Sequence, residues 1–308
     1  MNTPTVSVCM ITYNQEQFIS QAIKGVLIQK TNFPIELIIS EDCSTDNTRI
    51  IIENYQKEFP DIIKADLPDY NRGMINNLKH NLSLAKGKYI AMCEGDDYWI
   101  DPCKLQKQFD FMETHPEYSL CFHNAIVHYE DGDKKDRLFA ELENREYTRQ
   151  ELTKRWLAPT ASFFFRKSIL HSQLYKAITQ SRKLAVGDEP LLMVTSYYGK
   201  IRGMDTVMSV YRKHKSGIMM QFDNEHYELC QHCIEMKRLM GDDLKSIWGL
   251  RTAKYAAIAI SLTRKGRGKY GFRLWKLAVS HEPQKVLIES IRYFIKGIKN
   301  FINHDQKI

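Results

Sequence analysis

Three carboxylates lie within four residues at Glu94, Asp96 and Asp97, directly after a short apolar segment. The segment Tyr89 to Cys93 has the length and residue types of a buried strand, so we expect the carboxylates at that strand's C-terminal end. Gly95 allows a sharp turn between them. Like charges this close repel each other unless a positive group lies among them, and a divalent cation with oxygen ligands is the simplest such group. An acidic surface turn is the alternative for a cluster that stands alone.

Two other polar groups follow predicted strands earlier in the chain. Val6 to Ile11 and Ile35 to Ile39 are apolar segments typical of buried strands, and helically spaced apolar residues lie between them. Alternating strands and helices predict a parallel α/β sheet covered by helices, in which ligands bind at the carboxyl ends of the strands. The residues that the first two strands bring to that edge are Thr12, Tyr13, Asn14 and Asp42.

The later part of the chain predicts further strands and helices. Thr148 and Glu151 have the spacing of a helix capping box. We expect strands near 118–129, 162–166 and 201–211, a helix that begins after Gly187, and helices broken near Gly241, Gly266 and Pro283 from residue 223 onward. The predicted domains are 1–221, divided near 115, and a helical extension over 222–308.

Composition limits the classes of protein. A chain of 308 residues with 43% hydrophobic content can bury a full core, and its length suits two domains or one large one. We expect no signal peptide, because Met1 leads almost directly into an apolar strand, and no apolar segment has the length of a membrane span. Seven cysteines without a framework spacing suggest reduced thiols and a cytoplasmic protein.

The positive charge is concentrated at the C-terminal end. From Arg264 onward there are eleven Lys or Arg residues and three acidic ones, a net charge of +8, so the first 263 residues sum to −1 of the total +7. A nucleic-acid-binding body is therefore not expected.

Several known site types do not fit. The first strand is followed by neither a glycine-rich dinucleotide turn nor a P-loop. The acidic residues after Asp42 resemble a calcium loop, but Asn47 replaces the required glycine. His226, Cys230 and Cys233 could contribute to a zinc site, although one helix rarely supplies a complete ligand set and we prefer ordinary packing. Cys93 has no evident base that would make it a nucleophile.

The motifs VSVCMITYN, SEDCSTDNT, NRG and EGDDYW, followed by GDEPL and YRKH, together resemble the family 2 glycosyltransferases, which have the GT-A fold. The resemblance covers about residues 4–220. It implies a GT-A type central sheet flanked by helices, a nucleotide-diphosphate sugar donor with a UDP-sugar favoured, Mg²⁺ or Mn²⁺, and inversion at the anomeric carbon.

The resemblance also implies roles for individual residues. Asp42 matches the carboxylate that contacts the nucleotide base, with Thr12, Tyr13 and Asn14 lining the same pocket. Asp188 matches the general base. His214 lies where some members place a metal or diphosphate contact.

Asp96 and Asp97 match the DxD-type motif, in which the second carboxylate binds the metal. Here Glu94-Gly95-Asp96-Asp97 replaces the strict spacing, so the resemblance leaves open how Glu94 and Asp96 share the ribose and metal contacts.

General chemistry agrees with these roles. Sugar transfer passes through an oxocarbenium-like transition state while charge grows on the leaving diphosphate, and the acceptor hydroxyl must lose a proton as it attacks. Asp188 could instead be an acid that opens a helix, Asp42 a turn-forming residue and His214 a surface histidine.

The last segment has the pattern of a basic amphipathic helix. Either it contacts an anionic membrane surface through residues 285–302, or it packs on the main domain with a solvated basic face. The apolar residues at helical spacing are Leu287, Ile291, Phe294, Ile298 and Phe301.

We therefore predict a cytoplasmic, metal-dependent, inverting glycosyltransferase that can work at the inner face of the membrane. Its acceptor would be a surface polysaccharide or a lipid-linked glycan. A sugar-phosphate nucleotidyltransferase and a non-catalytic nucleotide-sugar-binding protein are the alternatives; the former usually begins with a glycine-rich basic loop after its first strand, which is missing here.

Overall fold

The protein forms two compact units in a computed structural model that describes residues 3–132, 134–217, 226–264 and 267–292. Unit 1 consists of Met1–Gln180 and Gly187–Lys215, and unit 2 of Ser181–Val186 and Ser216–Ile308. The domain boundary that we predicted near residue 221 lies among residues 218–225, outside the described part of the chain.

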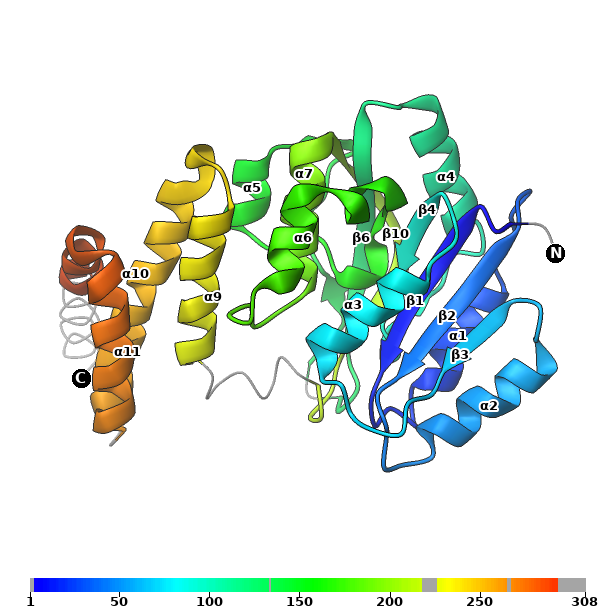
Figure 1. The fold of residues 1–308 in the computed structure, drawn as a ribbon, viewed down its shortest axis with the longest axis horizontal. Coiled ribbons are helices and arrows are strands. Elements are labelled where there is room, and N and C mark those ends of the chain that lie inside the picture. The colour runs from blue at the N-terminus through cyan, green and yellow to red at the C-terminus, as the bar shows by residue number, and fades with distance from the viewer. Residues whose placement is uncertain (1–2, 133, 218–225, 265–266, 293–308) are drawn as a thin grey trace. The chain divides into compact units, whose positions relative to one another are not determined.

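The N-terminal half of unit 1 is a parallel α/β sheet with strand order β3-β2-β1-β4. Because crossovers between parallel strands are right-handed, α1 and α2 cover one face and α3 the other. Figure 1 shows α3 in front of β1 and α1 behind the strands. The elements are β1 (Val6–Thr12), α1 (Ile19–Leu27), β2 (Ile35–Glu41), α2 (Thr48–Glu58), β3 (Ile63–Asp66), α3 (Met74–Leu84) and β4 (Tyr89–Met92).

Apolar side chains hold this half together. On one face of β1 the side chains of Val6, Val8 and Met10 are fully buried. Ser7 and Cys9 on the other face are also buried, as expected for a strand covered on both faces. The helix α1 buries Ile19 and Ile23 four residues apart, on the face that packs against the sheet. Complete burial of each large aliphatic side chain contributes about 1.5–3 kcal/mol, so these strands form a rigid base for the loops at their carboxyl ends.

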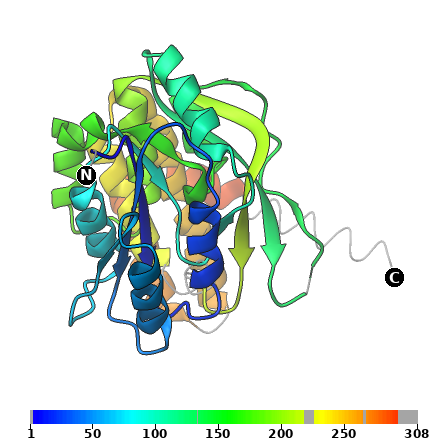
Figure 2. The same cartoon turned by 90° about the vertical axis from the view of Figure 1, so that its right-hand side faces the viewer.

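The second half of unit 1 extends the sheet in mixed directions, in the order β4-β9-β6-β10-β5. Figure 1 labels β6 and β10 in this half, and Figure 2 shows the same ribbon turned by 90°. The strand β9 runs antiparallel to both β4 and β6, β6 and β10 are parallel, and β5 is antiparallel to β10. The elements are β5 (Tyr98–Trp99), α4 (Lys104–Thr114), β6 (Tyr118–Tyr129), β7 (Arg137–Leu138), β8 (Arg145–Tyr147), α5 (Arg149–Lys154), β9 (Phe164–Arg166), α6 (Gln173–Gln180), α7 (Asp188–Tyr198) and β10 (Lys200–Lys213), with 3-10 turns at Thr160–Ser162 and Lys167–His171.

The predicted capping box and the longer predicted strands are confirmed. Thr148 Oγ1 accepts a hydrogen bond from the Glu151 amide at 3.2 Å, and the Glu151 carboxylate accepts one from the Thr148 amide at 2.8 Å. The strand that we expected from Ser162 begins later, at Phe164. The residues before it form a 3-10 turn in which the Ser162 hydroxyl donates to the Pro159 carbonyl at 2.6 Å.

The described residues of unit 2 from His226 onward are mainly helical, as predicted for the C-terminal extension. Its helices pack around a small apolar core that includes Cys230 and Leu274. The predicted break at Gly241 separates the first two helices, and Gly266 lies outside the described residues. Within the described part of the chain, no helix has the length and apolar character needed to cross a bilayer. The helices are α9 (His226–Leu239), α10 (Asp242–Arg264) and α11 (Gly268–His281).

The predicted basic amphipathic tail is described only as far as residue 292. The backbone is helical again from residue 283, and Leu287 and Ile291 are 63% and 51% exposed. Phe294, Ile298 and Phe301 lie outside the described residues.

Candidate active site

The carboxyl ends of β1, β2 and β4 meet at one edge of the sheet, as the sequence predicts. The Asp42 amide donates a hydrogen bond to the Thr12 carbonyl, and the Gly95 amide donates to the Ile11 carbonyl, each at 3.0 Å. A Cβ atom at Gly95 would lie 2.7 Å from Thr12 Oγ1, so glycine is required for this close approach. The turn after β4 is thereby held against the end of β1.

Asn14 ties the loop after β1 to the loop after β2. Its backbone has a positive φ of 51°, a conformation that asparagine tolerates better than most residues. The backbone N–H of Asn14 donates a hydrogen bond to Ser44 Oγ at 2.9 Å. The side-chain oxygen of Asn14, Oδ1, accepts a hydrogen bond from the backbone N–H of Thr45 at 2.8 Å. Tyr13, at the tip of the first loop, is 46% exposed. The loop is therefore fixed, with one aromatic ring open to solvent.

Asp42 is buried, with only 3% of its surface exposed. Its Oδ1 accepts the Arg72 amide at 2.7 Å, and its carbonyl accepts from the Asn71 side chain at 2.8 Å. Gly73 follows with a φ of 77° and begins the approach to α3. The turn Asn71-Arg72-Gly73 thus anchors the Asp42 carboxylate, which the family resemblance assigns to the nucleotide base.

The two adjacent aspartates of the acidic turn have different environments. Asp97 is 1% exposed, and its Oδ1 accepts the Arg212 amide at 2.9 Å. Its Oδ2 is buried with no hydrogen-bond partner within the described residues. Burial and the neighbouring charge of Asp96 raise the pKa of Asp97 well above its usual value, against the opposing effect of Arg212.

Asp96 is more open and faces His214. Its Oδ2 lies 3.1 Å from His214 Nε2, and 23% of its side chain is exposed. The Arg212 side chain donates to the Asp96 carbonyl at 3.1 Å. The His214 ring also packs on Phe18, with 4.6 Å between the ring centroids. The predicted metal residues Asp96 and His214 therefore meet, although they are far apart in the sequence.

Asp188 begins α7 and is held through both carboxylate oxygens. Oδ2 accepts a hydrogen bond from the Thr160 hydroxyl at 3.0 Å, and Oδ1 accepts from the Glu189 amide at 2.8 Å. Burial raises the pKa of Asp188, and these two hydrogen bonds oppose the rise. A raised pKa brings a carboxylate closer to the value suited to a general base.

Glu94 links the acidic turn to Asp188. Burial raises the pKa of Glu94 well above its usual value, and the charges of Asp96, Asp97 and Asp188 add to the rise. These charges show that Glu94, Asp96, Asp97 and Asp188 form one acidic cluster.

Sequence reasoning missed Thr160 and Arg212 as parts of this site. Arg212 lies within the YRKH segment that contributes to the family resemblance, so its position was a usable signal. Thr160 lies in a short turn after Pro159 that matches none of the recognised motifs.

The donor set fits a divalent cation that shares its coordination with a diphosphate. Asp96 offers a hard oxygen ligand beside the His214 imidazole, and the unpaired Asp97 Oδ2 lies in the same turn. Among the described residues there is no group of three His, Cys, Asp or Glu side chains that could hold a metal without other ligands. The cysteines of α9 therefore form no such group with other described residues. Mg²⁺ is usually held by one or two carboxylates together with substrate phosphates rather than by a complete protein cage.

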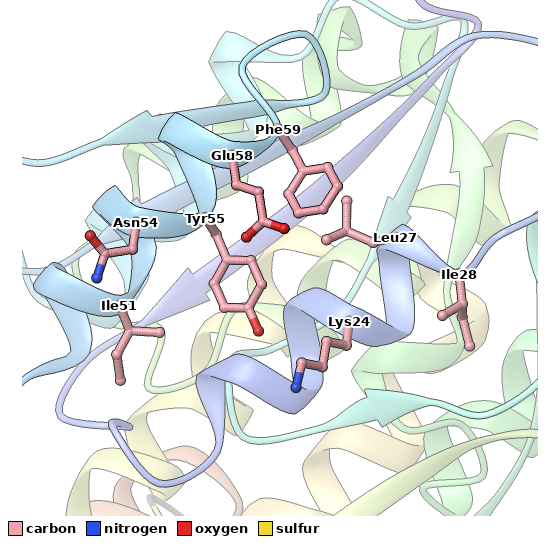
Figure 3. Close-up of a pocket in the computed structure, with 8 residues that line it drawn as sticks. All are labelled: Lys24, Leu27, Ile28, Ile51, Asn54, Tyr55, Glu58 and Phe59. Atoms are coloured by element: carbon pink, nitrogen blue, oxygen red, sulfur yellow. The ribbon is translucent and has the colours of Figure 1, made fainter.

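A surface groove of unit 1 does not coincide with this site. It lies between α1 and α2 and is lined by apolar residues with a few polar ones (Figure 3). The labelled residues are Lys24, Leu27, Ile28, Ile51, Asn54, Tyr55, Glu58 and Phe59. None of them is a predicted site residue, and we assign the groove no role in catalysis.

Comparison with known proteins agrees with this geometry. The family model described as "Glycosyl transferase family 2" matches residues 7–173. The chain belongs to glycosyl transferase family 2. This family membership confirms the predicted resemblance and favours glycosyl transfer over the nucleotidyltransferase alternative.

Relatives of this family 2 chain include proteins from several bacteria. An uncharacterized protein of Mycobacterium tuberculosis is 38% identical over 214 residues, which cover 69% of the chain and 60% of the relative. The chain thus spans about 60% of the length of this relative. The putative glycosyltransferase EpsE of Bacillus subtilis is 37% identical over 136 residues, 44% of the chain and 48% of EpsE.

Solved structures with the same fold are much more distant in sequence. Staphylococcus aureus TarS in complex with UDP-GlcNAc has a TM-score of 0.66 and 18% identity, covering 92% of the chain and 81% of TarS 1–349. The mannosyltransferase PcManGT of Pyrobaculum calidifontis, in complex with GDP-Man and Mn²⁺, has a TM-score of 0.57 and 14% identity over 96% of the chain and 88% of PcManGT. These likenesses confirm the predicted GT-A fold.

Proposed function

We propose that the protein transfers a sugar from a nucleotide-diphosphate sugar, with a UDP-sugar favoured, to a hydroxyl of a surface glycan or lipid-linked acceptor, and that the anomeric carbon is inverted. One observation carries the proposal. The Thr160 hydroxyl donates a hydrogen bond to Asp188 Oδ2 at 3.0 Å, and the charge of Asp188 raises the pKa of Glu94 in the acidic turn. The carboxylate that we propose as the general base therefore lies near the acidic turn that we propose to bind the diphosphate through a metal.

In this proposal the chain binds the donor at the carboxyl ends of β1, β2 and β4. Asp42 contacts the nucleotide base, beside Thr12, Tyr13 and Asn14. Asp96 and His214 would hold Mg²⁺ or Mn²⁺ at the diphosphate, and Asp97 Oδ2 would be a further ligand from the same turn. When bound, such a cation supplies Lewis-acid stabilisation of the charge that grows on the leaving diphosphate.

Asp188 is the general base of the proposed reaction. Its carboxylate accepts the proton of the acceptor hydroxyl while that oxygen attacks the anomeric carbon from the face opposite the leaving group. The hydrogen bonds from Thr160 and the Glu189 amide orient the carboxylate before the acceptor arrives. Preorganisation of this kind removes the cost of orienting the base during the reaction.

The name of a related protein suggests the acceptor class. The putative teichuronic acid biosynthesis glycosyltransferase TuaG of Bacillus subtilis is similar to this chain, at 32% identity over 145 residues. A surface-polysaccharide acceptor follows by analogy. It would place the enzyme at the cytoplasmic face of the membrane, where residues 285–302 could contact lipid.

Calorimetric titration tests the donor site. UDP and GDP are titrated into the full chain with and without Mn²⁺, and the measurement is repeated on Asp96→Ala. We expect one nucleotide to bind in a metal-dependent manner and Asp96→Ala to lose that dependence. Failure of both nucleotides to bind under every condition would overturn the proposal.

Turnover tests the base separately. With a donor sugar that the enzyme hydrolyses or transfers, Asp188→Asn should lower kcat by about 10²–10⁴-fold while nucleotide binding stays within a factor of two or so of the original. Unchanged turnover in Asp188→Asn would remove Asp188 from the mechanism without affecting the donor site.

A further inference from the structure

Two large aromatic side chains of α11 are open to solvent. Phe272 is 65% exposed and Trp275 is 39% exposed. They are three residues apart on one side of the helix, and their rings lie nearly parallel with centroids 6.4 Å apart. A different side of the helix, with Gly271, Leu274 and Ala278, is buried against the rest of unit 2. The exposed rings are therefore not required for the core of this unit.

Basic side chains surround the exposed rings. Lys269, Arg273 and Lys276 are exposed on the same helix, and α11 contains no acidic residue. Over the described residues 267–292 the sequence carries six Lys or Arg residues and two Glu residues. A helix that buries one face in its own domain and presents aromatic and cationic side chains on another has the character of a membrane-interface helix.

We propose that α11 docks unit 2 onto an anionic lipid bilayer, with Phe272 and Trp275 inserted at the headgroup level and Lys269 and Lys276 against lipid phosphates. This contact is distinct from the one suggested for residues 285–302, and it requires no assumption about the donor or the acceptor.

The charge distribution favours a lipid surface over a second copy of the chain. A symmetric contact between two α11 helices would bring the same basic side chains face to face, and like charges across an interface are unfavourable. An anionic membrane attracts each of these charges, and aromatic rings are well suited to its interface. Dimer formation through these rings is the alternative outcome of the experiment below.

Co-sedimentation of the full chain with vesicles tests the proposal. The vesicles contain either phosphatidylcholine alone or phosphatidylcholine with phosphatidylglycerol. We expect binding to the anionic vesicles, and we expect Phe272→Ser/Trp275→Ser to weaken it by about tenfold or more. A matched control, Ile28→Ser/Ile50→Ser, removes two exposed apolar side chains from unit 1 and should bind like the unmodified protein.

Two further measurements separate the causes. Lys269→Glu/Lys276→Glu should weaken binding to anionic vesicles and leave the thermal midpoint nearly unchanged, because both side chains are exposed. Sedimentation velocity without lipid should give the same species for the unmodified protein and for Phe272→Ser/Trp275→Ser.

Two results would overturn the proposal. The first is equal vesicle binding by the unmodified protein and the aromatic variant. The second is a dimer in solution that the aromatic variant converts to a monomer. Nucleotide titration of the same samples keeps this test independent of the donor site.

Discussion

The hydroxyl of Thr160 donates a hydrogen bond to Oδ2 of Asp188 at 3.0 Å, although the two residues belong to separate elements of unit 1. This bond stabilises the charged form of Asp188, because a carboxylate is the acceptor. It therefore opposes the rise in pKa that burial causes. Thr160 would act as a positioning residue for the proposed base.

Removal of this hydroxyl should change the pH dependence of turnover. A base works in its deprotonated form, so activity is lost as pH falls through the raised pKa of Asp188. In Thr160→Val that pKa rises further, and the acid side of the kcat profile should move to higher pH, with about tenfold lower kcat below the shifted pKa. Thr160→Ser keeps the hydroxyl and should restore the original profile.

A purely structural role for Thr160 would give a different result. In that case Thr160→Val would lower the thermal midpoint and leave the shape of the pH profile unchanged. The profile, measured with saturating donor and acceptor, separates the two roles.

Asp96 and Asp97 should respond differently to substitution. Asp96 is partly open and faces His214, so Asp96→Ala should abolish the effect of Mn²⁺ on nucleotide affinity with little change in folding. Asp97 is buried and accepts the Arg212 amide, so Asp97→Ala should lower the free energy of unfolding by about 1–3 kcal/mol because a buried donor loses its acceptor.

Chemical denaturation and calorimetry on the two variants check this division. Asp97→Asn, which keeps an acceptor oxygen for the Arg212 amide, is the matched control for folding. Loss of the Mn²⁺ effect in Asp97→Asn but not in Asp96→Ala would assign the metal to Asp97, as the family resemblance implies.

Asp42 offers a similar separation of binding from folding. In Asp42→Asn the side-chain oxygen can still accept the Arg72 amide, so the fold should be retained while nucleotide affinity falls by about 10-fold or more. Asp42→Ala should lose both affinity and stability. Titration of UDP and of uridine shows whether the lost contact belongs to the base or to the diphosphate, and an unchanged uridine affinity would contradict the base contact.

Lys104, the first residue of α4, is a fully buried lysine. Its Nζ donates to Gln108 Oε1 at 2.8 Å and lies 3.8 Å from the centre of the Trp99 ring. Burial lowers its pKa to about 7. In the unfolded chain the pKa of a lysine is about 10.4. Between about pH 7 and about pH 10.4 the unfolded state therefore binds more protons than the folded state, and the free energy of unfolding rises with pH.

Between pH 6 and pH 9, we therefore expect the free energy of unfolding of the unmodified protein to rise by about 2 kcal/mol relative to Lys104→Met. Urea denaturation at several pH values measures this difference. The exposed Lys57→Met is the control, and its pH dependence should match that of the unmodified protein. Parallel curves for Lys104→Met and the unmodified protein would contradict a neutral buried amine.

The convergence of Thr12, Asp42 and Asp96 could be predicted from the sequence, because each follows a buried apolar strand and parallel strands present their carboxyl ends at one edge. The pairing of Asp96 with His214 could only be suggested by the family resemblance. Nothing local to either residue determines a contact between segments 118 residues apart.

The turn at Thr160 and the exact start of the short strand β9 could not be predicted from the sequence, for a related reason. A strand of three residues has too few positions to show alternation, and β9 is held by its pairing with β4 and β6 on either side. The separate environments of Asp96 and Asp97 depend likewise on Arg212, which reaches the acidic turn from β10.

The division of the chain into units has a practical consequence. Residues 181–186 belong to unit 2, where the Ser181 hydroxyl donates to Glu235 Oε1 at 2.8 Å and the Ala185 amide to His232 Nδ1 at 3.3 Å. Asp188 follows this segment by two residues. A truncated protein that stops after Lys215 would keep every proposed catalytic residue, yet it would lose the anchors of the loop that leads into its base. Unit 2 therefore consists of two separate segments of the chain, and it cannot be removed or exchanged by a cut at a single junction.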